Sequence, residues 1–394
     1  MKKWISSLMV TILMASIIAT PAFANETGDR ANNEISLANE AKSAILLERD
    51  TGEVLYEKNS HEKLPPASMT KIMTMMLIME ALDTEKILPT DKVRTSEYAA
   101  SMGGSQIFLE PGEEMTVEEM LKGIAIGSAN DASVAMAEHL AGSEEGFVQM
   151  MNEKVKELGL KDTQFKNPTG LPAEGHYSSA YDMAMMGREL LKYEGITKFT
   201  GSYESYLREN TEKKFWLVNT NKLVRFYPGV DGIKTGFTNE AKYCLTATAN
   251  KGNMRVIASV FGAPTPKVRN AEVTKLLDYA FAQYMTHPLY KKADVLGEAK
   301  ISKGSKSYVN AETSEPISVL TKKGEKVDGV EEEVKFDTKL KAPVEKGQQV
   351  GTLTVKRDGK VVVETPIVAS ESIEAASWWK LFKDTFGQFS KTGK

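Results

Sequence analysis

The chain has 394 residues, a hydrophobic content of 41% and a formal net charge of -3 at pH 7. This length exceeds what one typical hydrophobic core organises, so we expect more than one domain. A nearly balanced charge excludes a broadly basic surface, and no nucleic-acid partner is expected. The single cysteine, Cys244, cannot form an internal disulfide and is predicted to be a small buried hydrophobic residue.

The amino-terminal residues have the pattern of a secretory signal peptide. Two lysines precede an apolar stretch over residues 4–20, and a small-residue cleavage pattern ends at Ala24. An uncleaved membrane helix is the alternative, but the apolar stretch is short for a span. We therefore predict a signal peptide over residues 1–24 and a flexible lead over residues 25–40. The protein would be exported, either to the outer face of the cytoplasmic membrane or as a secreted protein.

The first predicted elements are a β-hairpin and a buried helix. Strands over residues 43–49 and 53–58 flank a glycine-containing turn. Two prolines then favour an extended approach to a helix that begins at Ser68 and continues through a methionine-rich segment. This helix is apolar on most of its circumference, which predicts burial. Lys71 would lie one turn after Ser68 on the same face.

The middle of the chain is predicted to be largely helical. A capping-box pattern at Thr116 and Glu119 begins one helix. A break over residues 127–130 separates it from a second helix over residues 131–140. Residues 144–192 then form a helix, a proline- and glycine-containing loop, and another helix.

Strand patterns return after this helical region. Four strands are predicted, over residues 214–218, 232–235, 243–249 and 254–261. An amphipathic pattern after Pro266 then predicts a helix that ends near His287. Because predicted strands precede and follow the helical middle, we expect one sheet with helices packed on it. This is an α+β domain over residues 41–290.

The last quarter of the chain has no helical periodicity until its end. Short β-branched segments alternate with glycine-containing turns, which predicts a small all-β domain over residues 291–370. Residues 371–394 place aromatic residues, including Trp378 and Trp379, on one side of a helical pattern and lysines elsewhere. This pattern predicts an amphipathic helix that anchors the protein to a membrane surface. A helix docked on the β domain is the alternative.

Three short motifs contain residues suited to acyl transfer. Ser68-Met69-Thr70-Lys71 begins the buried helix, Ser128-Ala129-Asn130 occupies the break between two helices, and Lys234-Thr235-Gly236 ends a predicted strand. A serine hydroxyl is a poor nucleophile until a base removes its proton, and a lysine can do so only when neutral. Burial and a second nearby cation both lower a lysine pKa. Each motif alone is common, so the inference depends on their occurrence together.

In this order and at these spacings, the motifs resemble those of the penicillin-interacting serine acyltransferases. The resemblance is greatest to low-molecular-mass penicillin-binding proteins that act as serine-type D-alanyl-D-alanine carboxypeptidases, and it extends from Ala41 to about His287. It implies a β-lactamase/transpeptidase-like catalytic domain, an antiparallel sheet with helices on both sides, and no metal or organic cofactor. The substrate would be a peptidoglycan stem peptide ending in D-Ala-D-Ala, and β-lactam antibiotics would be covalent inhibitors.

The resemblance also implies catalytic roles. Ser68 would be the acylated nucleophile and Lys71 the base that takes its proton. Ser128 would relay a proton toward the leaving D-alanine. Asn130 would position both the substrate amide and the Lys71 amine.

The substrate-binding residues follow from the third motif in the same way. Lys234 and Thr235 would hold the terminal carboxylate, and Gly236 would let the substrate backbone approach the strand. The backbone N–H groups of Ser68 and Phe237 would form the oxyanion hole. Phe237 departs from the polar residues that are usual there in some relatives, and this departure concerns side-chain selectivity.

Rival functions fit the sequence less well. A Ser-His-Asp hydrolase needs a histidine in a recognisable setting, and a zinc enzyme needs clustered ligands; the sequence offers neither. A serine β-lactamase shares the fold and the acylation step, but we find no segment like the class A deacylating glutamate motif, and the extra β domain also argues against it. A penicillin-binding sensor or scaffold that acylates without hydrolysis is the non-enzymatic alternative. It would release no D-alanine.

Overall fold

The computed structural model describes residues 36–193 and 195–379. The predicted signal peptide, most of the predicted lead and the predicted C-terminal helix beyond residue 379 lie outside these ranges. Within them, every helix is too short or too polar to cross a membrane.

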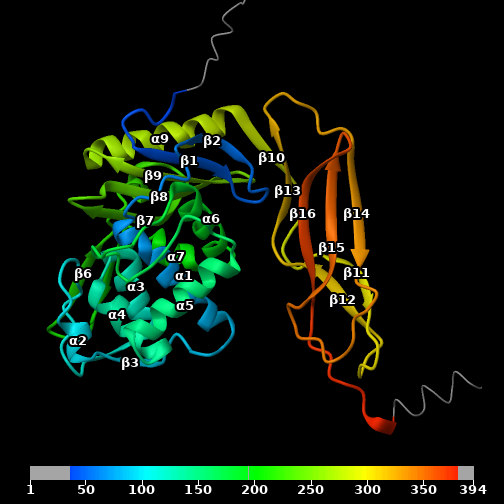
Figure 1. The fold of residues 1–394 in the computed structure, drawn as a ribbon, viewed down its shortest axis with the longest axis horizontal. Coiled ribbons are helices and arrows are strands. Elements are labelled where there is room, and N and C mark those ends of the chain that lie inside the picture. The colour runs from blue at the N-terminus through cyan, green and yellow to red at the C-terminus, as the bar shows by residue number, and fades with distance from the viewer. Residues whose placement is uncertain (1–35, 194, 380–394) are drawn as a thin grey trace, which may run out of the picture. The chain divides into compact units, whose positions relative to one another are not determined.

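A five-stranded antiparallel sheet organises the first part of the chain (Figure 1). The strands are β2 (Val54–Lys58), β1 (Ser43–Glu48), β9 (Met254–Ala263), β8 (Lys242–Lys251) and β7 (Val230–Thr238), in this spatial order. The predicted hairpin and the predicted union of early and late strands in one sheet are confirmed. Strand β7 lies at one end of the order, so only one of its edges is paired with another strand of the sheet.

Helices and short turns fill the rest of this domain. They are η1 (Ala67–Thr70), α1 (Lys71–Asp83), α2 (Glu97–Ala100), α3 (Val117–Lys122), η2 (Gly123–Gly127), α4 (Asn130–Ala141), α5 (Glu144–Glu157), α6 (Ala180–Leu190), α7 (Ile196–Thr200), α8 (Leu223–Phe226) and α9 (Pro266–Gln283). Two small hairpins, β3 (Lys92–Arg94) with β4 (Glu114–Thr116) and β5 (Glu204–Leu207) with β6 (Phe215–Val218), lie among them.

Two hydrophobic clusters cover opposite faces of the sheet. Helix α9 packs on one face, while α1 and α6 pack on the other (Figure 1). Along β1, Ile45 and Leu47 belong to the α1 cluster, and Ala44 and Leu46 belong to the α9 cluster. Successive side chains of a strand point to opposite faces, so a continuous apolar strand is what a sheet covered on both sides requires.

The predicted helix from Ser68 consists of two parts. Ser68 lies in the 3-10 turn η1, and α1 follows from Lys71 with all but a few of its side chains buried. The capping box is also confirmed, because Thr116 and Glu119 bond each other's backbone at the start of α3.

The predicted end of the last helix of this domain is wrong. Helix α9 ends at Gln283, and residues near His287 form strand β10 (Tyr284–Tyr290), which pairs with β13 (Ile317–Lys322). The proline at position 288 disfavours the helical conformation in the residue before it, which is consistent with an extended chain.

The remaining strands confirm the predicted all-β domain. A five-stranded sheet contains β11 (Val295–Lys300), β12 (Tyr308–Thr313), β16 (Lys360–Ala369), β15 (Gln349–Arg357) and β14 (Val330–Phe336), in this order. Its buried core is a separate hydrophobic cluster.

The predicted C-terminal helix does not begin at residue 371. Ile373 and Ala375 instead form isolated β-bridges to Val344 and Gly304, and Ile373 is buried in the β domain. The extended segment thus adds to the edge of the β domain and places Ile373 in its core, while Ala375 remains exposed. Helical conformation begins only at Trp378 within the described residues.

Candidate active site

Ser68 lies in a turn that is packed between two other segments. A Cβ atom at Gly170 would lie 1.9 Å from the carbonyl oxygen of Ala67, and one at Gly236 would lie 2.6 Å from that of Pro66. A larger residue at either position would collide with backbone, so glycine is required for these close approaches. The turn therefore contacts strand β7 on one side and the loop of Gly170 on the other.

The Lys71 amine connects three segments of the site. Its Nζ lies 3.1 Å from Ser68 Oγ, 2.7 Å from Asn130 Oδ1 and 2.6 Å from the carbonyl oxygen of Thr169. A neutral amine has two N–H groups, which can serve the Asn130 and Thr169 oxygens. Its lone pair is then left for the Ser68 hydroxyl proton.

Electrostatics favour this neutral form. Lys71 is fully buried, and its pKa is lowered well below the ordinary lysine value, first by burial and then by the positive charge of Lys234. Asp131 acts in the opposite direction, with a smaller effect. A lysine with a lowered pKa beside a serine is suited to remove the serine proton.

The break between η2 and α4 positions Ser128 and Asn130. Ser128 has a φ of 62°, in the left-handed region, and it is 4% exposed. Its hydroxyl has no hydrogen-bond partner among residues 36–193 and 195–379, which leaves it available to a ligand. Asn130 donates from Nδ2 to the carbonyl oxygen of Gly103 at 2.7 Å while Oδ1 accepts from Lys71.

Asp131 is a structural residue of the site that the sequence analysis did not identify. Its carboxylate accepts backbone N–H bonds from Ile107 at 3.1 Å and from Leu109 at 3.0 Å. The backbone N–H of Asn130 donates to the carbonyl oxygen of Ser105 at 2.7 Å. Together these bonds hold the loop of residues 103–109 against the start of α4.

Strand β7 brings a buried cation to the same place. Lys234 is 1% exposed, and burial and the nearby charge of Arg269 lower its pKa to about 7. The next residue, Thr235, donates from Oγ1 to Thr220 Oγ1 at 2.8 Å. The lowered pKa makes the charge of Lys234 partial near neutral pH in the free enzyme.

Arg269 was also missed, because no motif marks it. It lies on α9 and is 6% exposed, and its guanidinium bonds only Asn270 within the described chain. Neither Arg269 nor Lys234 has a carboxylate partner among the described residues. Two buried cations without a counter-ion make a region that favours a bound anion, because such an anion offsets the cost of their burial.

The structure thus brings together residues from all three motifs. Lys71 contacts Ser68 and Asn130 directly, and the charge of Lys234 acts on Lys71. Phe237, which follows Gly236, has a side chain that is 49% exposed and stacked on Tyr243 at a ring-centroid distance of 4.4 Å. Its ring therefore lies at the surface.

Comparison with known proteins identifies the family of the chain. Residues 29–265 match the family model of peptidase S11, D-alanyl-D-alanine carboxypeptidase. The chain belongs to this family. Residues 284–375 match the model of the penicillin-binding protein 5 C-terminal domain.

Individual S11 relatives match most of the chain. D-alanyl-D-alanine carboxypeptidase DacF of Bacillus subtilis is 64% identical over 99% of this chain and 100% of its own length. The crystal structure of penicillin-binding protein 5 from Haemophilus influenzae is 32% identical, with a TM-score of 0.66, and the match covers 85% of this chain and 98% of that chain. Penicillin-binding protein D2 from Listeria monocytogenes, solved in an ampicillin-bound form, is 30% identical with a TM-score of 0.54 and covers 62% and 99%.

Membership of the S11 family confirms the predicted fold and enzyme class. The chain is a serine-type D-alanyl-D-alanine carboxypeptidase with a penicillin-binding protein 5 type C-terminal β domain. The rival assignments to other hydrolase classes are therefore set aside.

Proposed function

We propose that Ser68 attacks the carbonyl carbon of the penultimate D-alanine in a peptidoglycan stem peptide. The observation that carries this proposal is the 3.1 Å contact between Ser68 Oγ and the buried Lys71 amine, whose pKa is lowered. Lys71 takes the hydroxyl proton as the new ester bond forms. The peptide C–N bond then breaks, and the leaving nitrogen receives a proton, so that D-alanine departs as a free amine.

Ser128 and Asn130 assist this step. The Ser128 hydroxyl, which is buried and without a partner among the described residues, passes the proton from Lys71 to the leaving nitrogen. Asn130 orients the Lys71 amine through its 2.7 Å hydrogen bond and has its own amide held by the Gly103 carbonyl. A water molecule then hydrolyses the ester and restores Ser68.

Residues of β7, together with Arg269 of α9, bind the terminal carboxylate. Lys234 and Arg269 supply positive charge. The Thr235 hydroxyl, which donates to Thr220 in the free enzyme, would rotate to donate its one hydrogen bond to the carboxylate. The absence of a side chain at Gly236 allows close approach of the substrate backbone. The backbone N–H groups of Ser68 and Phe237 stabilise the oxyanion.

The same chemistry opens a β-lactam ring. A penicillin presents a strained amide and a carboxylate that can occupy these positions, and Ser68 would form a stable acyl-enzyme. The ampicillin-bound form of the Listeria relative supports this extension. Intact-mass measurement after incubation with penicillin, paired with a D-alanine release assay, tests the whole proposal.

Ser68→Ala should lose both the penicillin adduct and D-alanine release. An adduct that persists at the wild-type level would remove the assignment of Ser68. Rapid penicillin turnover without D-alanine release would favour a β-lactamase, and an adduct without D-alanine release would favour a sensor or scaffold.

Export and membrane association complete the proposal. Stem peptides lie outside the cytoplasm, and residues 1–24 have the pattern of a signal peptide. Trp378 and Trp379 are 66% and 67% exposed at the last described residues, which suits an interfacial anchor. Because residues up to Ala375 bridge to the β domain, the informative truncation removes only residues 378–394. The truncated enzyme should leave the membrane fraction and still hydrolyse soluble peptides; continued sedimentation with membranes would refute the anchor.

A further inference from the structure

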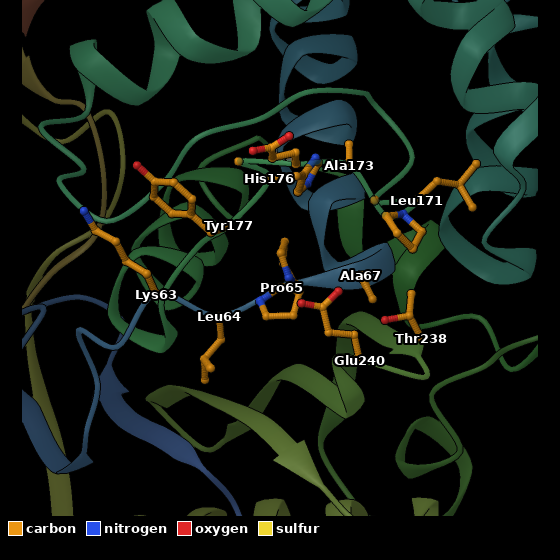
Figure 2. A pocket seen from close by; sticks show the side chains of 15 residues that line it. Lys63, Leu64, Pro65, Ala67, Leu171, Ala173, His176, Tyr177, Thr238 and Glu240 are labelled. Carbon is orange, nitrogen blue, oxygen red and sulfur yellow. The ribbon is translucent and has the colours of Figure 1, made fainter.

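A cavity of about 570 Å³ lies directly beside the nucleophile turn (Figure 2). Its walls come from residues 63–67, which lead into Ser68, from residues 170–177, and from Thr238 and Glu240 after β7. Ala67 is part of the wall, so the cavity adjoins the residue that precedes the nucleophile.

The position of the cavity relative to β7 determines which part of a bound substrate can reach the cavity. The residues proposed to hold the terminal carboxylate, Lys234 and Thr235, precede Phe237 on the strand, whereas Thr238 and Glu240 follow it. A strand advances about 3.3 Å per residue, so Thr238 lies about 10 Å beyond Thr235. A peptide lying along β7 with its carboxylate at Lys234 therefore directs its opposite, acyl-side residues toward the cavity.

Two carboxylates in the cavity wall have no partner. Glu174 and Glu240 are both exposed, and neither forms a hydrogen bond or ion pair with any residue in the described ranges. Figure 2 shows the Glu240 side chain near Pro65 and Ala67. Unpaired carboxylates on a concave wall favour a cationic ligand.

The other ionisable groups of the wall are already engaged. Lys63 lies 3.9 Å from the Asp162 carboxylate and 5.1 Å from the centroid of the Tyr177 ring. His176 has both ring nitrogens in hydrogen bonds, to Thr70 Oγ1 and to the backbone N–H of Lys166, and its pKa is lowered to about 4. It is therefore neutral at physiological pH. Lys63 is thus the one cation of the wall that lies near a carboxylate, whereas Glu174 and Glu240 have no partner among the described residues. Lys166, which lies beside Gly175 and whose charge acts on His176, adds a second positive charge behind this part of the wall.

We propose that this cavity binds the side chain of the residue that precedes D-Ala-D-Ala, and that Glu174 and Glu240 select a side chain that ends in a free ammonium group. This inference rests on the proposed function, since it assumes that the substrate lies along β7 with its carboxylate at Lys234. The rigid flanking prolines, Pro65 and Pro172, keep the wall open and apolar around the aliphatic part of such a side chain.

Selection by charge distinguishes two chemical states of the same peptide. A free side-chain amine is an ammonium ion at neutral pH, whereas an acylated amine is a neutral amide. Peptides whose amine is still free would therefore be trimmed faster than peptides whose amine has been acylated. The acyl group also adds bulk to the end that lies against the two carboxylates.

The test compares two peptides that differ only at this amine. They are Nα-acetyl-L-Lys-D-Ala-D-Ala and Nα,Nε-diacetyl-L-Lys-D-Ala-D-Ala, and the readout is kcat/KM for D-alanine release. The wild-type enzyme should prefer the free amine by about 10-fold, which corresponds to about 1.4 kcal/mol. The double variant Glu174→Gln/Glu240→Gln should bring the ratio to about one. Glu331→Gln, an exposed residue of β14 in the C-terminal domain, is the matched control and should keep the wild-type ratio.

A charge reversal separates recognition from structural damage. Glu240→Lys should favour the Nε-succinyl peptide, whose side chain ends in a carboxylate, over the free amine. Equal kcat/KM values for both peptides in the wild type, or an unchanged preference in the double variant, would overturn the inference while D-alanine release upholds the proposed function. Release of D-alanine from neither peptide would overturn both.

Discussion

Lys71 and Lys234 are both fully buried, and the positive charge of Lys234 lowers the pKa of Lys71. The two lysines come from segments that lie far apart in the sequence, and the pKa of each is lowered: that of Lys71 by burial and Lys234, that of Lys234 by burial and Arg269. Their proposed roles require opposite protonation states, because a base must be neutral and an anion-binding group must be charged.

Replacing Lys71 by arginine should remove catalysis. A guanidinium group cannot be neutral at accessible pH, so it cannot accept the Ser68 proton. We expect the acylation rate with a fluorescent penicillin to fall about 10³-fold. Lys122→Arg, on α3 and paired with Glu118, is the control and should be indistinguishable from the wild type. An arginine variant at position 71 that acylates within 10-fold of the wild type would contradict the role of the base.

The pH dependence of kcat/KM should have an alkaline limb well below the ordinary lysine pKa of 10.5. Burial and Arg269 lower the pKa of Lys234 to about 7 in the free enzyme, so the ammonium loses its proton as the pH rises through this value, and substrate binding weakens. A bound carboxylate stabilises the ammonium and raises its pKa. The limb of kcat should therefore lie at higher pH than that of kcat/KM.

Arg269→Gln provides the check on this assignment. Removal of the guanidinium charge raises the pKa of Lys234, and the alkaline limb of kcat/KM should move to higher pH even as its maximum decreases. If the alkaline limb of kcat/KM stays at the same pH in this variant, a group other than Lys234 is responsible for it.

Gly170→Ala should disable the site by displacing backbone. The new Cβ would lie 1.9 Å from the Ala67 carbonyl oxygen, and the φ of +82° is unfavourable for alanine. A shift of about 1 Å in the nucleophile can cost about 100-fold in rate, and we expect at least this loss in acylation. Gly324→Ala is the matched control: its φ is +87°, but no atom lies within 4 Å of the added Cβ. It should lower the free energy of unfolding by about 1 kcal/mol and leave acylation unchanged.

Asp131→Asn should loosen the loop of residues 103–109. An amide presents N–H groups where the carboxylate now accepts bonds from Ile107 and Leu109, so at least one buried backbone donor loses its partner. We expect a loss of about 2 kcal/mol in the free energy of unfolding and slower acylation. Asp91→Asn, which removes a comparable carboxylate acceptor from an exposed turn, should cost much less. Thermal unfolding and the acylation rate measure both effects, and equal losses in the two variants would refute the argument.

The local parts of the site could be predicted from the sequence. A spacing of three residues on one helical turn places Ser68 and Lys71 near each other. The apolar run after them predicts burial, which holds fully for Lys71, whereas Ser68 is half-buried. The alternation and burial of the strand segments likewise predict a sheet built from early and late strands. These signals are short-range patterns, and tertiary packing reinforces them.

The remaining contacts of the site come from loops that are distant in sequence, and no local sequence pattern predicts where such loops lie. Thr169 offers its carbonyl oxygen to Lys71 across 98 positions of sequence, and any residue type could supply that oxygen. In the sequence, Arg269 is an ordinary residue of a helix. Only the packing of α9 brings its charge close enough to affect Lys234. Short elements such as α7 and β5 were also missed, because segments of four or five residues are too brief to show a period.

Because Ala67 is packed between Gly170 and Gly236, covalent penicillin labelling can also be used to follow folding. Ser68 becomes reactive only when segments separated by about a hundred residues close around one turn, so an incompletely folded chain contains the serine without the reaction. The yield of labelled protein during refolding therefore reports the arrival of native tertiary structure, which circular dichroism of the helices alone would not distinguish from a collapsed intermediate.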